Sequence, residues 1–157
     1  MDGFTTSLWF DDQGEEAAEF YCSVFPDSKI ISTIPYSEAG PGVPGTVMQV
    51  NFELFGQRFN AINGGPMFPF TEAVSIQVDC DGQDEVDHYW DVLTADGGQE
   101  SQCGWLKDKY GLSWQIVPKQ LSDVFEGLAP ETSKRVMEEL LSQRKLDLAK
   151  LQAAASD

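Results

Sequence analysis

The stretch LWFDDQGEEAAEFY, residues 8–21, has a second copy in IQVDCDGQDEVDHY, residues 76–89, at a gapless offset of 68 positions. Gly14 lies over Gly82 in this alignment, and Tyr21 lies over Tyr89. Self-similarity at a fixed offset indicates that one supersecondary unit occurs twice in the chain. The repeat therefore decides the fold.

Each copy predicts a strand followed directly by a helix. Residues 7–10 and 73–78 alternate between apolar and other side chains, which is the pattern of a strand with two unlike faces. The helical segments then carry apolar side chains at three- and four-residue spacing, on one face. Residues 12–15 (DQGE) resemble a capping box, and Asp81 is the expected cap of the second helix.

Further strands are expected behind each helix, at residues 29–36, 46–55 and 57–63 and near residues 99–102, 103–107 and 112–117. A second alignment, at an offset of 55, lays residues 56–62 on residues 111–117. Each half is therefore predicted as β-α-β-β-β, and the chain as an α+β protein. Helices that cover one sheet end or a partner subunit are expected at residues 121–126, 131–143 and 146–155.

The composition excludes several classes of partner. The chain has 157 residues, and its 26 acidic against 10 basic side chains give a formal net charge of −16. Such a charge disfavours nucleic acids and anionic membrane surfaces, which attract basic proteins. No apolar stretch approaches the ~20 residues that cross a bilayer, and Met1-Asp2-Gly3-Phe4 lacks the basic region of a secretory signal. We therefore expect a cytoplasmic protein.

The three cysteines contain no C-x-x-C pair, and His88 is the single histidine. This composition argues against a disulfide framework, a zinc knuckle, a multi-histidine metal site and a conventional Ser-His-Asp triad. Cys103 is the one candidate catalytic nucleophile, because Lys107 and Lys109 follow it closely and could stabilise a thiolate. The catalytic residues are otherwise unassigned, and His88 is expected on a helix surface.

The paired units resemble the vicinal-oxygen-chelate superfamily, which includes glyoxalase I, extradiol dioxygenases, fosfomycin-resistance enzymes and bleomycin-resistance proteins. The sequence looks most like its PhnB-like, 3-demethylubiquinone methyltransferase-like branch. The phrases that carry this likeness are LWFD (8–11), AAEFY (17–21), FPDSK (25–29), AINGGP (61–66) and CGWLKDKYGLSWQ (103–115). The resemblance implies one domain over residues 1–120, with the glyoxalase/bleomycin-resistance fold.

Within that domain the resemblance implies two repeats, about 4–65 and 72–118, that curve into a mixed sheet, with residues 121–157 as a helical extension. It also implies that the repeats form a cup whose polar face holds the ligand. The predicted lining is a mostly neutral set of hydrogen-bonding side chains with one indole, namely Ser7, Trp9, Gln49, Asn51, Asn60, Ser75, Gln77, Ser113 and Gln115. Such a surface suits a small polar or aromatic ligand, although outward-facing strand positions are also polar for solubility alone. Trp114 is expected in the core.

Metal-dependent relatives place their ligands near the start of the first strand and on the last strand of each half. The resemblance puts Thr5, Asn60, Ala73 and Gln115 at these four positions. Divalent metals at such sites need imidazole or anionic oxygen ligands, so we predict that the metal site is absent and that no cofactor is bound. If the alignment with the metal-dependent relatives were shifted, Glu53 would become a candidate metal ligand.

Residues 40–45 (GPGVPG) satisfy the spacing G-x-G-x-x-G. Two prolines remove amide donors, and a strand rather than a helix is expected next, so nucleotide binding is not predicted and a methyltransferase activity has no motif to support it. Two functions of the cup remain, besides a structural or partner-binding role for the C-terminal helices. One is a metal-independent lyase, isomerase or transferase that acts on a small polar or aromatic metabolite. The alternative is a non-catalytic protein that sequesters a small molecule, and a homodimer is expected for either.

Overall fold

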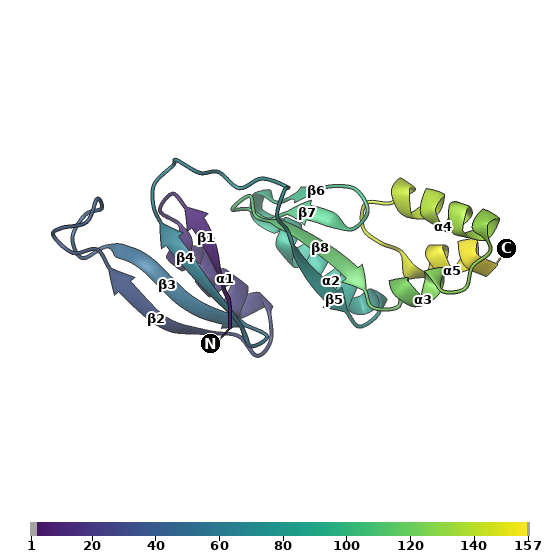
Figure 1. Ribbon diagram of the computed structural model, residues 1–157, viewed down its shortest axis with the longest axis horizontal. Helices are drawn as coiled ribbons and strands as arrows, with labels where there is room; N and C mark the ends of the chain where they lie inside the picture. The colour runs from purple at the N-terminus through teal and green to yellow at the C-terminus, as the bar shows by residue number, and fades with distance from the viewer. Residues whose placement is uncertain (1–2, 157) are drawn as a thin grey trace. The chain divides into compact units, whose positions relative to one another are not determined.

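The computed structural model describes residues 3–156, so residues 1, 2 and 157, at the ends of the predicted ranges 1–120 and 121–157, lie outside it. The chain divides into two compact units, Met1–Phe70 and Thr71–Asp157 (Figure 1). Each unit contains one βαβββ half, and the second also contains the C-terminal helices. The α+β class and the repeated βαβββ order predicted from the sequence are confirmed.

The first unit is a four-stranded mixed sheet with one helix. Its elements are β1 (Thr5–Phe10), α1 (Gly14–Val24), β2 (Lys29–Pro35), β3 (Val47–Leu54) and β4 (Gln57–Asn63). The strand order is β1-β4-β3-β2, in which β1 and β4 are parallel and the other pairs antiparallel. Alternate residues of β1, β3 and β4 are buried, so one sheet face packs into the core with α1 while the other remains partly exposed.

Aromatic side chains fill the core of the first unit. The ring of Tyr21 on α1 stacks on Phe52 with centroids 6.4 Å apart, and Phe52 stacks on Phe59 at 5.4 Å. All three side chains are almost completely buried. This packing fixes the sheet against the helix and leaves the opposite face of the sheet for polar residues.

The second unit repeats this arrangement with shorter strands. Its elements are β5 (Ile76–Cys80), α2 (Gln83–Thr94), the 3-10 turn η1 (Ala95–Gly97), β6 (Gln99–Glu100), β7 (Trp105–Lys107) and β8 (Ser113–Pro118). The strand order is β5-β8-β7-β6, with β5 and β8 parallel. Trp90 of α2 and Trp114 of β8 are buried in its core, as predicted for Trp114, and His88 is exposed on α2.

The C-terminal helices have a small core of their own. They are α3 (Leu121–Phe125), α4 (Pro130–Ser142) and α5 (Leu148–Ser156) (Figure 1). The side chains of Val124, Val136 and Leu151 pack between them. The segment between α4 and α5 docks on the second half, because the Cys103 amide donates to the Gln143 carbonyl oxygen at 2.9 Å. The helical extension is therefore anchored to the second half through the turn before β7.

Both predicted helix caps are wrong. Helix α1 begins at Gly14, no side chain of residues 12–15 caps it, and the Gly14 amide instead donates to Asn63 Oδ1 at 2.7 Å. A Cβ at Gly14 would lie 2.6 Å from that oxygen, so this contact requires glycine. Helix α2 has Gly82 at its cap position, and the Asp81 amide donates to Glu85 Oε2 at 2.7 Å. For α1, an acceptor distant in the sequence replaces the expected one, whereas for α2 the Glu85 carboxylate accepts from an amide that precedes the helix.

Candidate functional site

Five of the predicted lining residues share the partly exposed face of the first sheet. Ser7 on β1 is paired with Asn60 on β4, and Asn60 is paired with Asn51 on β3, so these side chains form one row. The amide of Gln49 donates to Asn51 Oδ1 at 2.8 Å, in the neighbouring row. Asn60 Oδ1 is buried and has no hydrogen-bond partner among residues 3–156. The row is uncharged and can both donate and accept hydrogen bonds.

Trp9 forms the aromatic part of the same face. Its Nε1 donates to the Gly65 carbonyl oxygen at 2.8 Å, and its ring meets Phe68 edge-on with centroids 5.1 Å apart. Both partners belong to the segment that follows β4. The indole is therefore held in one orientation next to the polar row, as a ligand-stacking ring would need to be.

Gln77, Ser113 and Gln115 lie on the second sheet, and Ser75 directly precedes β5. Gln77 on β5 is paired with Gln115 on β8, and Gln115 Nε2 donates to Ser75 Oγ at 2.8 Å. Ser113 points to the same face because it lies two residues before Gln115 on β8. Its side chain is only 1% exposed, and its Oγ has no hydrogen-bond partner in the part of the chain that is described. Each half therefore presents neutral hydrogen-bonding side chains on one sheet face, and in the second half Asp79 lies on that face too, where it accepts from Gln77 Nε2 at 2.7 Å.

Ser113 also lines a cavity of about 120 Å³ that the sequence did not reveal. Lys107, the cross-strand partner of Ser113, lies beside it, and its Nζ is 2.5 Å from Glu72 Oε1. This hydrogen bond from Lys107 lowers the pKa of the Glu72 carboxyl from its ordinary value. The alternation Trp105, Leu106, Lys107 is the signal that could have placed Lys107 on the polar face.

The four positions implied for metal ligands do not supply a metal site. Ala73 has no donor atom, and Gln115 and Asn60 offer only neutral amide oxygens. Glu53, the alternative, is paired with Lys29 at 3.3 Å and lies opposite Arg58, so cations already neutralise it. No group of three histidine, cysteine, aspartate or glutamate residues in the described chain could hold a metal ion. The residues do not fit the divalent metal that the superfamily implies.

Cys103 lies on the turn before β7, with a backbone φ of 55°. Lys107 is engaged by Glu72, and Lys109 Nζ lies 5.2 Å from the centroid of the Tyr110 ring. Cys103 does not line the cavity beside Ser113. It does not line the second cavity either, which lies in the first unit and is described next. No contact within the described part of the chain supports a nucleophilic role for Cys103, so this role stays a prediction.

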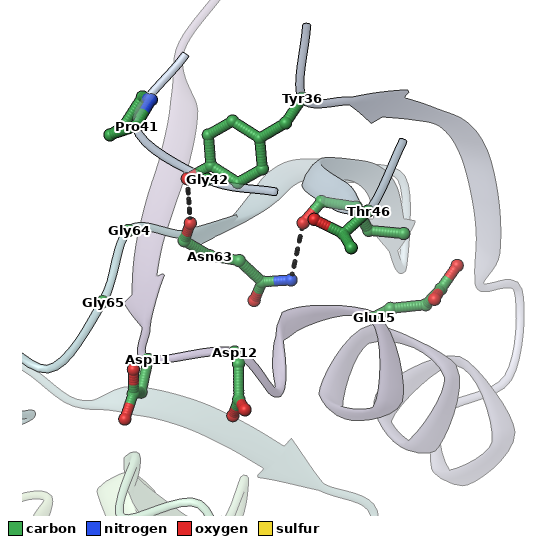
Figure 2. Close-up of a pocket in the computed structure, with 11 residues that line it drawn as sticks. Asp11, Asp12, Glu15, Tyr36, Pro41, Gly42, Thr46, Asn63, Gly64 and Gly65 are labelled. Atoms are coloured by element: carbon green, nitrogen blue, oxygen red, sulfur yellow. Dashed lines mark hydrogen bonds between the residues drawn. The ribbon is translucent and has the colours of Figure 1, made fainter. Parts of the chain in front are cut away.

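The larger cavity, of about 490 Å³, lies within the first unit where β1 and β4 end (Figure 2). Figure 2 shows Asn63 between the Tyr36 ring and the turn that carries Asp11 and Asp12. The Tyr36 hydroxyl donates to the Asn63 carbonyl oxygen, and Asn63 Nδ2 donates to the Val47 carbonyl oxygen at 3.0 Å. The GPGVPG segment contributes Pro41 and Gly42 to the wall, and β3 follows it as predicted.

Comparison with known proteins places the chain in a family. The sequence model described as 3-demethylubiquinone-9 3-methyltransferase matches residues 2–117. The PhnB protein from Bacillus cereus is 39% identical, with a TM-score of 0.67, over 74% of this chain and 99% of that chain. The chain belongs to the 3-demethylubiquinone-9 3-methyltransferase-like family. The PhnB-like branch of the vicinal-oxygen-chelate superfamily, inferred from the sequence, is thereby confirmed.

More distant structures share the fold alone. Protein PA1353 from Pseudomonas aeruginosa is 16% identical, with a TM-score of 0.62 over 76% of this chain and 98% of its own. The fosfomycin resistance protein FosX from Listeria monocytogenes, solved with Mn(II) and sulfate, is 14% identical, with a TM-score of 0.55 over 80% of this chain and 97% of its own. No curated protein matches the sequence. None of the described helices is long and apolar enough to cross a membrane.

Proposed function

We propose that the polar face of each sheet is a binding surface for a small polar or aromatic metabolite and that the protein acts on this metabolite without a metal ion. The observation that carries this proposal is the placement of two buried, unpartnered polar atoms. Asn60 Oδ1 and Ser113 Oγ both belong to the face predicted to line the cup. A buried polar atom without a partner costs about 1–3 kcal/mol, which a ligand's hydrogen bond would recover.

The neighbouring groups favour a neutral or aromatic ligand on the first sheet. The row of Ser7, Asn60 and Asn51 offers amides and hydroxyls, and the fixed indole of Trp9 offers a stacking surface. Metal independence follows from the donor set, because neutral amides bind divalent ions poorly. The proposal includes a homodimer, which the family resemblance implies, and a location in the cytoplasm, which the sequence analysis predicts.

Binding without turnover is the alternative function. It is favoured by Cys103 and His88, the candidate nucleophile and the only imidazole, because within the described part of the chain neither has a contact that would activate it. A compound that binds and is consumed would establish the enzyme. A compound that binds unchanged would establish sequestration.

The test is a ligand-observed NMR screen with phenol, indole, catechol and benzamide, followed by titration of any compound that binds. Asn60→Leu, which keeps the side-chain size and removes the amide, is expected to weaken binding about tenfold, or about 1.4 kcal/mol. Glu19→Gln, on the exposed side of α1, serves as the matched control and should bind like the wild type. Equal affinities for the wild type and Asn60→Leu, or no binding of any compound, would contradict the proposal.

A further inference from the structure

We propose that Lys107 and Ser113 bind the carboxylate of a small organic acid, in the place that the Glu72 side chain takes when no such acid is bound. This inference rests on the proposed function, since Lys107 and Ser113 lie on the polar face of the second sheet. The proposed ligand therefore carries one carboxylate, and the rest of the molecule is polar or aromatic.

The first argument is the geometry of the cavity. Lys107 and Ser113 are paired across β7 and β8, so the ammonium and the hydroxyl are neighbours on one face. Both line the cavity of about 120 Å³, which exceeds the roughly 30 Å³ that a water molecule occupies in the liquid. The buried Ser113 hydroxyl has no acceptor among residues 3–156, and an anionic oxygen held by Lys107 would provide one.

The second argument is that a carboxylate already occupies one side of the cavity. Glu72 lies in the segment before β5, and its Oε1 is 2.5 Å from Lys107 Nζ. The Glu72 side chain is nevertheless 65% exposed, so the pair is open to solvent and gains little stability from its charges. An incoming carboxylate can therefore replace Glu72 at a small cost, since one ion pair is exchanged for another.

The charges around the cavity favour a monoanion over a phosphate. Among residues 3–156, Lys107 is the one cationic side chain that lines the cavity, beside Glu72 and Glu100. Glu100 is held by its own partners: its Oε1 accepts from Trp90 Nε1 at 3.0 Å, and its Oε2 lies 3.7 Å from Arg144. A single ammonium balances one negative charge, whereas a dianion would leave one charge uncompensated next to two carboxylates.

The test compares a carboxylic acid with its amide, so that shape stays constant while charge changes. Benzoate and benzamide are titrated by calorimetry into the wild type and into Glu72→Gln. The variant removes the competing charge, so we expect it to bind benzoate about tenfold more tightly than the wild type does, with the affinity for benzamide unchanged. Lys107→Met should abolish the preference for benzoate, while Lys109→Met, next to the same strand, should retain it.

Amide NMR spectra of the unmodified protein supply a second readout that does not depend on any variant. Benzoate is expected to shift the Glu72, Lys107 and Ser113 signals together. Equal affinity for acid and amide in Glu72→Gln, no benzoate binding, or shifts confined to other residues would overturn the inference. If phenol or indole still binds to the wild type and binds more weakly to Asn60→Leu, only the carboxylate assignment fails. If neither compound binds, the proposed function fails as well.

Discussion

Replacing Asp108 with alanine is expected to lower the free energy of unfolding by about 3 to 5 kcal/mol, the largest effect of any substitution considered for the second half. The Asp108 side chain is 2% exposed, and its Oδ1 accepts from the amides of Tyr110 and Leu112 at 2.9 and 3.1 Å. Its Oδ2 accepts from Trp114 Nε1 at 2.8 Å. Alanine would leave these three donors without that acceptor, two of them in buried surroundings.

Urea denaturation of Asp108→Ala and Asp108→Asn measures this effect. Asparagine keeps one acceptor oxygen for the two amides but turns an NH₂ group toward Trp114 Nε1, so it should recover only part of the lost stability. Asp84→Ala, on the exposed first turn of α2, should change stability by less than about 0.5 kcal/mol. A loss below about 1 kcal/mol for Asp108→Ala would show that the carboxylate does not organise the turn between β7 and β8.

Gly64→Ala is expected to destabilise the protein by about 2 to 3 kcal/mol and to displace the indole of Trp9. A Cβ at position 64 would lie 2.1 to 2.5 Å from atoms of that ring, so the ring must move. Its hydrogen bond to the Gly65 carbonyl oxygen and its edge contact with Phe68 would be lost together. The substitution therefore also tests whether a fixed indole matters for binding.

A double-mutant cycle separates this steric effect from a backbone effect. In a Trp9→Leu background the clash disappears, so Gly64→Ala should cost at least about 1 kcal/mol less than it does in the wild type. The indole NMR signal of Trp9 reports the displacement directly. If Gly64→Ala lowered the free energy of unfolding equally in both backgrounds, the effect would come from the backbone at position 64. The claim that Gly64 makes room for the Trp9 indole would then be wrong.

The strands and their polar faces were predictable because they depend on local alternation and on the two sequence offsets. Asn60 and Gln115, matched at an offset of 55, both lie on the polar face of the last strand of their half. Their registers differ by two residues, because Asn60 is paired with Ser7 while Gln115 is paired with Gln77, the counterpart of Trp9 at the offset of 68. The first helix cap was not predictable, because Asn63 reaches Gly14 across 49 residues of sequence and replaces a cap expected from neighbours. Tertiary contacts of this kind override local capping signals.

The places of the candidate lining residues were predictable to the same extent, whereas their role in binding stays a prediction. Period-two alternation identified the neutral lining residues, and the structure brings each set onto one sheet face. Glu72 was missed because it lies outside every strand, and its pairing with Lys107 depends on the path of the segment before β5. The cavity around Asn63 was missed for a similar reason, since its walls come from the turn between β1 and α1, the end of β4 and the segment between β2 and β3.

The most direct test of the central claim is the metal dependence of ligand binding. Purified protein is analysed for bound metals by mass spectrometry, treated with a chelator, and titrated with the compound that binds in the screen. The account predicts less than stoichiometric zinc, nickel, manganese or iron, and the same affinity before and after chelation, because Asn60, Gln115 and their neighbours bind through neutral hydrogen bonds. Stoichiometric metal, together with binding that is lost on chelation and restored by that metal, would contradict it.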